Sequence, residues 1–253
     1  GQAAPSDPTP DHIVDRDLIV SYDEPENLNN ALHPSVATAP QGSPFEDWTY
    51  VVWDELDEDG GYKEIMFSSS PDGGKTWTHD EPSEGDCIIS HSEKGKANNG
   101  PAVNPSIAVS RDGVIHVIWA ERISTDGTWE VFYSRSTDNG DTWTGETSNI
   151  PISHRAGSEN DAQIISAPKL VVGNPYGKAD IMLHAVWSEF TPKDGQEVHY
   201  SRSLNGGLTW PAVEQGETIL SKDNDWIFAY NPTVGVSGQE ANFIHVAWSQ
   251  RGN

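Results

Sequence analysis

The chain has 253 residues and a formal net charge of −24 at pH 7, with ten tryptophans and one cysteine. This acidity excludes nucleic acid as a partner, because the surface repels phosphates, and it argues against anionic membranes as well. No apolar run approaches the roughly 18 residues of a membrane span, so we expect no membrane insertion. The lone Cys87 excludes an internal disulfide.

Residues 1–16 precede the first patterned segment and are interpreted as a flexible leader. The first ten of them are rich in proline and small residues and lack an initiator Met. Two origins remain open: a leader exposed when a targeting segment is cleaved, or an expression remnant. We assign residues 17–253 to one domain.

Three short strand patterns then recur in a fixed order along the chain. Each is β-branched or aromatic and is bounded by glycine turns, which is typical of strands. The first pattern opens near a proline and covers 34–37, 105–109, 168–172 and 232–236. The second ends at a tryptophan and covers 50–53, 116–119, 184–187 and 245–248. The third covers 64–67, 130–133 and 197–200.

A glycine-rich octet follows each third strand, at 70–77, 136–143 and 203–210. The octets share a serine at the first position, an Asp or Asn at the third and a tryptophan at the eighth. The residues at the third and eighth positions are Asp72, Trp77, Asp138, Trp143, Asn205 and Trp210. Side chains of Asp and Asn accept bonds from turn amides, and glycine supplies positive φ angles. We therefore predict hairpin turns under which the tryptophan rings are buried.

A fourth strand is expected after each octet, ending in Ile89-Ser90, Ile152-Ser153 or Leu220-Ser221. Four antiparallel strands in a repeat of about 65 residues form a propeller blade. The predicted fold is an all-β propeller with about four blade equivalents. The blades cover about 33–90, 104–153 and 167–221, with a partial blade at 231–253.

Residues 17–22 resemble the end of a fourth strand, and the third strand and octet of the last repeat are missing. We therefore expect segment 17–22 to close the ring of blades and the chain to be incomplete. Otherwise the open edge of the partial blade should drive self-association, because unpaired strand edges recruit partners.

The three octets resemble the Asp-box, or BNR repeat, of the sialidase-like propeller superfamily over about residues 33–253. The third octet departs from that pattern by carrying Asn205 in place of Asp. The resemblance implies a secreted or cell-surface location and places the octet turns on the face opposite the ligand-binding side.

The sialidase catalytic signature is absent from the sequence. Sialidases carry an Arg-Ile-Pro motif and three substrate-binding arginines, whereas here Arg16-Asp17-Leu18 is the nearest early segment. Arg122, Arg155 and Arg251 lie in or next to loops on the expected ligand side and are the candidates for an arginine cluster. We predict no catalytic residue and lean toward a protein that is not an enzyme.

Acidic residues offer two further candidates, each with a structural alternative. Glu121 and Glu189 repeat two residues after a strand tryptophan, so either they line a ligand site or they bond to neighbouring backbone. Asp57 and Asp59 alternate as in a calcium loop, but Met66 stands where such a loop needs glutamate. The alternative is an ordinary turn, and no other cofactor is expected.

The long polar loops between blades, together with the hairpins near 54–62, 121–129 and 189–196 on the same side, carry aromatic residues outside the repeat pattern, namely Trp129, Trp226 and Tyr230. Rings beside amides and carboxylates are typical of sugar or peptide recognition, although such rings also seal blade junctions. The favoured hypothesis is a non-catalytic extracellular propeller that binds a glycan or a protein, or that builds a surface assembly. The alternative is a sialidase-like glycoside hydrolase with part of its catalytic residues outside this chain.

Overall fold

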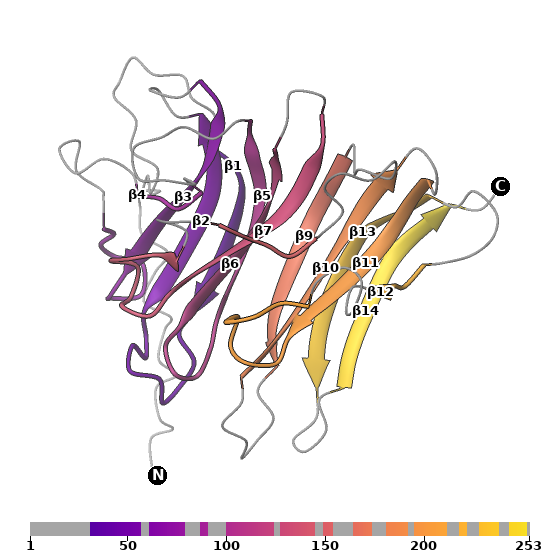
Figure 1. Ribbon diagram of the computed structural model, residues 1–253. Helices are drawn as coiled ribbons and strands as arrows, with labels where there is room; N and C mark the ends of the chain where they lie inside the picture. The colour runs from indigo at the N-terminus through magenta and orange to yellow at the C-terminus, as the bar shows by residue number, and fades with distance from the viewer. Residues whose placement is uncertain are drawn as a thin grey trace, which may run out of the picture.

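The computed structural model describes residues 31–56, 61–78, 87–90, 100–123, 127–144, 149–153, 164–173, 181–191, 195–211, 218–221, 228–237 and 243–251. All regular elements among these residues are strands (Figure 1). Their bounds are β1 Leu32–Thr38, β2 Thr49–Leu56, β3 Lys63–Ser70, β4 Cys87–Ile88, β5 Ala102–Val109, β6 Ile115–Arg122, β7 Trp129–Ser136, β8 Ile150–Pro151, β9 Ile164–Gly173, β10 Met182–Thr191, β11 Gly195–Ser203, β12 Thr218–Ile219, β13 Phe228–Ser237 and β14 Phe243–Arg251. Within these ranges no helix has the length and hydropathy that a membrane crossing requires.

The strands form antiparallel meanders, one for each sequence repeat. Two four-stranded sheets have the orders β1-β2-β3-β4 and β5-β6-β7-β8, and β9 to β12 repeat this arrangement. The hairpin β13-β14 joins the third sheet through one parallel bridge, Gln196 to Phe228. The predicted β-propeller with four-stranded blades is therefore confirmed, with three blades and two strands of a fourth described.

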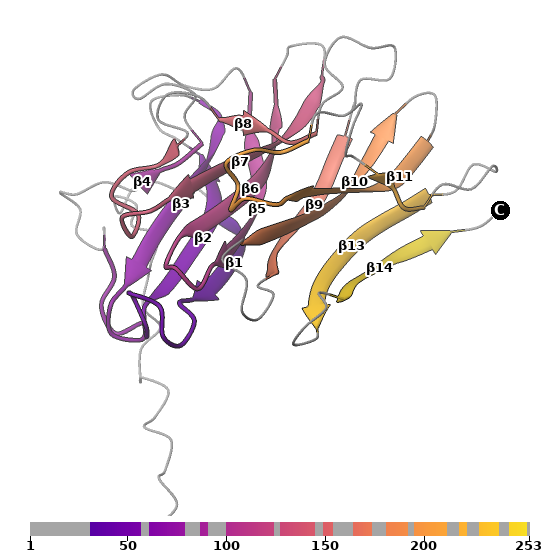
Figure 2. The same cartoon turned by 60° about the horizontal axis from the view of Figure 1, so that its bottom comes forward.

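The first strand of each blade lies at the centre of the molecule. Strands β1, β5, β9 and β13 contact one another in succession, whereas β4, β8 and β12 are short outer strands. In Figure 2 the four first strands follow one another across the molecule. Each first strand runs from one face of the propeller to the other. One face, called the strand-start face here, therefore collects the starts of β1, β5, β9 and β13, and the opposite face carries the octet turns.

Neighbouring blades are held together by apolar faces that pack against each other. Phe67 of the first blade meets Trp143 of the second with ring centroids 5.0 Å apart, and Tyr133 meets Trp210 of the third at 5.3 Å. Trp143 and Trp210 are 6% and 9% exposed, so these two octet tryptophans bury their rings as predicted, whereas Trp77 of the first octet is only half-buried. The octets thus close their own hairpins and also join adjacent blades.

The octet turns have the hydrogen bonds expected from their sequence. Asp72 Oδ1 accepts from the backbone nitrogens of Lys75 at 3.0 Å and Thr76 at 2.9 Å. The Trp77 indole donates to the carbonyl of Gly74 at 3.2 Å. In the third octet Asn205 Oδ1 accepts from the nitrogen of Thr209 at 3.0 Å, so the amide replaces the carboxylate in the turn.

The bounds of the first and fourth strands of each blade differ from the sequence prediction. The first strands begin two to four residues before the expected prolines, and a register shift absorbs each proline, as between Leu32 and Ser35. The outer strands have only two residues, and the Ile-Ser pairs follow them instead of ending them. Ser153 Oγ accepts from the nitrogen of Val131 at 2.6 Å and donates to Glu130 at 2.7 Å. A side-chain bond therefore replaces a further ladder pair.

The expected leader and the expected closing strand at 17–22 lie outside the described residues. Closure of the ring by that segment stays a prediction.

Candidate functional site

The strand-start face carries a polar cluster centred on Asp54, near the end of β2. Its carboxylate is fully buried and accepts three bonds. His33 Nδ1 lies 2.6 Å from Oδ1, Lys63 Nζ lies 2.7 Å from Oδ2, and the nitrogen of Asn104 lies 3.1 Å from Oδ1. The side chains of His33 and Lys63 remain 50% and 28% exposed. A buried anion therefore holds two partly exposed basic side chains.

Two members of this cluster, His33 and Asn104, lie in backbone bulges of β1 and β5. His33 and Asn104 precede the prolines of β1 and β5, and they have positive φ angles of 52° and 57°. Asn231 has the same conformation in β13, with φ of 52°. A left-handed residue before proline is unfavourable unless its surroundings compensate, and bulges of this kind often re-aim side chains near functional sites. In the β5 bulge, the backbone N–H of Asn104 donates to the Asp54 carboxylate.

The charged side chains of this cluster all come from the first blade and have no charged equivalent of Asp54 in the other blades. Positions equivalent to Asp54 hold Ala120, Ser188 and Ser249, which carry no charge. A residue that recurs in every blade serves the blade, whereas one that occurs once breaks the symmetry of the propeller. Asp54, His33 and Lys63 are therefore the best candidates for a reaction centre. Sequence reasoning missed them because they lie in three strands and form no local motif.

The repeated glutamates Glu121 and Glu189 have a different environment. They are 5% and 1% exposed, and each accepts a bond from the tryptophan two residues earlier, at 2.9 Å from Trp119 and 3.2 Å from Trp187. Burial raises the pKa of Glu121 to about 8, Glu64 adds to the rise, and the Trp119 bond acts against it. At neutral pH the Glu121 side chain is therefore mostly a neutral acid within its own blade.

The other predicted ligand-binding residues are spread over the same face. Arg122 is half-buried at the end of β6, and its backbone nitrogen donates to Pro101 at 3.1 Å, next to the start of β5. Trp129 begins β7 and is half-buried, whereas Tyr230, near the start of β13, is 36% exposed. Phe228 is 45% exposed beside it. Arg155, Trp226, Asp57 and Asp59 lie outside the described residues.

The strand histidines do not gather at a common centre. His116 Nδ1 lies 2.8 Å from Tyr133 Oη and its Nε2 lies 3.0 Å from Ser110 Oγ, while His184 Nδ1 lies 2.8 Å from Tyr200 Oη. Burial lowers the pKa of His116 to about 3 and that of His184 to about 4. Across the described ranges, no three His, Cys, Asp or Glu residues are grouped to hold a metal ion. Calcium at Asp57 and Asp59 stays untested.

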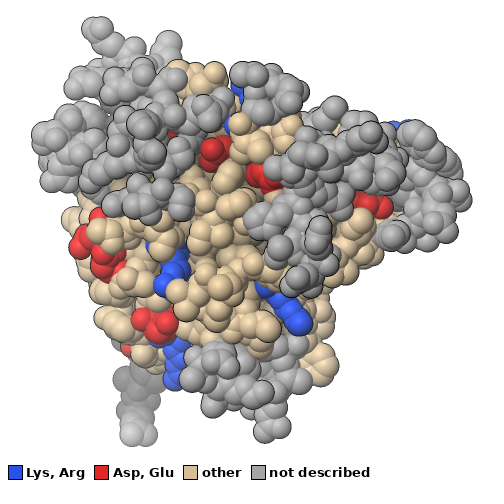
Figure 3. All heavy atoms as spheres, in the orientation of Figure 1, with Lys and Arg blue, Asp and Glu red and all other residues tan. Residues whose placement is uncertain are grey.

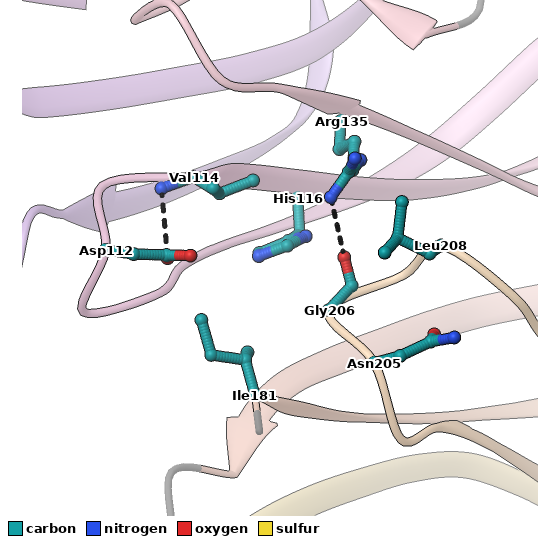
Figure 4. A pocket seen from close by; sticks show the side chains of 8 residues that line it. All are labelled: Asp112, Val114, His116, Arg135, Ile181, Asn205, Gly206 and Leu208. Atoms are coloured by element: carbon teal, nitrogen blue, oxygen red, sulfur yellow. Dashed lines mark hydrogen bonds between the residues drawn. The ribbon is translucent and has the colours of Figure 1, made fainter. Parts of the chain in front are cut away.

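A cavity of about 300 Å³ lies on the octet-turn face, between the second and third blades. Figure 4 shows Asp112 and Arg135 on either side of His116, with Ile181 and Asn205 facing them. On the face drawn in Figure 3, the described acidic and basic side chains lie among uncharged residues.

A comparison with protein families finds no match, and a comparison with curated proteins finds none either. Solved structures with a similar arrangement include an endo-arabinanase from Bacillus licheniformis, 14% identical, with a TM-score of 0.47 over 86% of this chain and 73% of that chain. An α-L-arabinanase from Penicillium chrysogenum is 14% identical, with a TM-score of 0.48 over 87% and 62%. An N-acetylgalactosamine deacetylase from F. plautii is 17% identical, with a TM-score of 0.48 over 90% and 65%. This chain thus spans about two thirds of the length of these proteins.

These comparisons correct two expectations from the sequence. The similar structures are arabinanases and a deacetylase, not sialidase-like Asp-box proteins, so the sialidase-like assignment is wrong. They are also enzymes, which contradicts the hypothesis of a non-catalytic binding or assembly module. The octet does not identify the family, because its Asp, glycines and Trp serve the hairpin turn in which they lie. At this level of similarity the likeness assigns no activity to the chain.

Proposed function

We propose that this propeller is part of a glycan-processing hydrolase whose reaction centre is the Asp54 cluster on the strand-start face. The observation that carries the proposal is the 2.6 Å contact between the buried Asp54 carboxylate and Nδ1 of the half-exposed His33. A buried carboxylate that orients an accessible imidazole is the arrangement that hydrolases use to activate water.

The roles follow from the geometry of the three side chains. With its Nδ1 proton directed to Asp54, His33 keeps a lone pair on Nε2 and accepts a proton from an attacking water. Asp54 stabilises the imidazolium that forms. Lys63, held 2.7 Å from Asp54, supplies a positive charge beside the developing anion. The same face exposes Phe228 and Tyr230, whose rings are suited to contact a sugar.

An extracellular location accords with a glycan substrate and belongs to the same proposal. The scissile bond is either a glycosidic bond or the amide of an N-acetylated sugar. In both cases water adds to the carbon, and the proton that His33 takes from the water returns to the departing sugar oxygen or amine nitrogen. Calcium bound by Asp57 and Asp59, which lie outside the described residues, is a further part of the proposal.

The test is a carboxylate-to-amide pair of variants assayed on arabinan and on acetylated amino-sugar oligosaccharides. Asp54→Asn should lower kcat by roughly 10²-fold or more, since it removes the charge that orients and stabilises His33. Because the change also breaks the buried contact to Lys63, kcat is compared at a temperature at which circular dichroism shows the variant to be folded. Glu189→Gln makes the same chemical change at a position bonded to Trp187 and should retain activity. Equal activity of Asp54→Asn and the wild type would refute the assignment of the centre.

A second variant separates the role of His33 from that of Asp54. His33→Gln should lower kcat by roughly 10²-fold or more, and the residual activity should lose the pH dependence contributed by an imidazole base. If His33→Gln remains active with the same pH profile, the imidazole is not the base and the proposed mechanism fails.

A further inference from the structure

The cavity on the octet-turn face arises from a difference between two equivalent blade junctions. At the first junction Tyr50 Oη donates to Asn139 Oδ1 of the next octet at 2.6 Å, so a phenol fills the space between the blades. At the second junction the equivalent residues are His116 and Gly206, which are both smaller. His116 turns inward to Tyr133 and Ser110, and a cavity of about 300 Å³ remains.

Two opposite charges flank this cavity and retain bonding capacity. Arg135 uses one nitrogen, Nη1, to donate to the carbonyl of Gly206 at 3.2 Å. Asp112 accepts from Ser110 Oγ and from the nitrogen of Val114 through Oδ1 alone. The further guanidinium donors and the second carboxylate oxygen remain for a bound molecule. Val114, Ile181 and Leu208 supply the apolar part of the lining.

We propose that this cavity binds a small zwitterion with an aliphatic side chain, such as a free α-amino acid. Arg135 takes the ligand carboxylate in a two-bond contact, and Asp112 takes the ammonium group. The aliphatic part packs against Ile181 and Leu208, the latter of which is 60% exposed without it. The volume lies at the lower end of the roughly 300–1,000 Å³ typical of ligand pockets, which limits the ligand to a few heavy atoms beyond the zwitterionic head.

Calorimetric titration of the whole chain with L-leucine tests the proposal. We expect saturable binding with a Kd on the order of 1 mM, and none of the uncharged N-acetyl-leucine amide. Binding of a neutral sugar such as arabinose in place of leucine would overturn the proposed ligand class. No saturable heat of leucine binding up to about 50 mM would overturn the site itself.

Matched variants locate the binding. Arg135→Gln should weaken leucine binding about tenfold or more, because it removes the charged contact to the carboxylate. Arg202→Gln makes the same change at the equivalent position of the third blade, which does not line this cavity, and should leave binding unchanged. His116→Tyr restores the phenol of the first junction and should abolish binding by filling the space. If Arg135→Gln binds leucine as the wild type does, the ligand is elsewhere and the proposal is wrong.

Discussion

The indole Nε1 of Trp119 donates to the Glu121 carboxylate at 2.9 Å, and Trp248 makes the same bond to the amide oxygen of Gln250 at 3.1 Å. Because the uncharged amide of Gln250 accepts this bond in the fourth repeat, the tryptophan indole needs a hydrogen-bond acceptor at this position and not a negative charge. This agrees with the pKa of Glu121, which burial raises to about 8.

Replacing Glu121 by Gln should therefore preserve the fold and change its pH dependence. The folded protein holds a proton on Glu121 up to about pH 8, whereas the unfolded chain releases it near 4.5. The wild type should thus lose stability as pH rises from about 4.5 to 8, by up to about 1.4 kcal/mol per pH unit from this group. Urea unfolding at several pH values should show a flatter profile for Glu121→Gln.

The exposed Glu46→Gln provides the control for this experiment, because it removes a carboxylate that is open to solvent. Its profile should match the wild type. Identical pH profiles of Glu121→Gln and the wild type would show that Glu121 is ionised in the folded state.

Alanine at Gly140 should destabilise the protein more than alanine at Gly74. Both glycines have positive φ, 100° and 91°, so the backbone strain is similar. A Cβ on Gly140 would lie 2.3 Å from Phe67 of the preceding blade, whereas one on Gly74 would lie 3.7 Å from its nearest neighbour. Overpacking should add about 1–3 kcal/mol to the loss for Gly140→Ala. Equal losses in chemical denaturation would mean that the blades do not dock through this turn.

Trp143→Ala should cost about 3–5 kcal/mol, because it removes a buried ring from the junction of the first two blades. The ring is 6% exposed and packs edge-on against Phe67. Denaturant unfolding measures the loss. A value below about 1 kcal/mol would show that the ring contributes little to packing.

His116 should remain neutral in the folded protein well below the pKa of a free imidazole. Its pKa is lowered from 6.5 to about 3, chiefly by burial, and neutral His116 therefore stabilises the fold above pH 6.5. That contribution should fade as pH falls from 6.5 toward 3. Imidazole resonances followed by NMR, with His116→Gln for assignment, should show no titration of this ring above about pH 5. A midpoint near 6.5 would contradict its burial.

The repeat pattern in the sequence determined the architecture. Strand order and octet turns follow from local rules, because hydrophobic alternation, turn glycines and Asp or Asn caps act within a few residues of one another. The same locality explains the errors. The sequence predicts that each first strand begins at its proline, because the pattern does not reveal that a β-bulge accommodates the proline inside the strand. The octets suggested a family, although they encode only a turn.

Only the tertiary structure decided the functional candidates. Asp54, His33 and Asn104 come from β2, β1 and β5, and their contacts depend on how two blades meet. The cavity beside His116 likewise follows from Tyr50 and Asn139 being replaced at an equivalent junction. Neither site has a sequence signature, because the distances that define them are set by packing between blades and not by spacing along the chain.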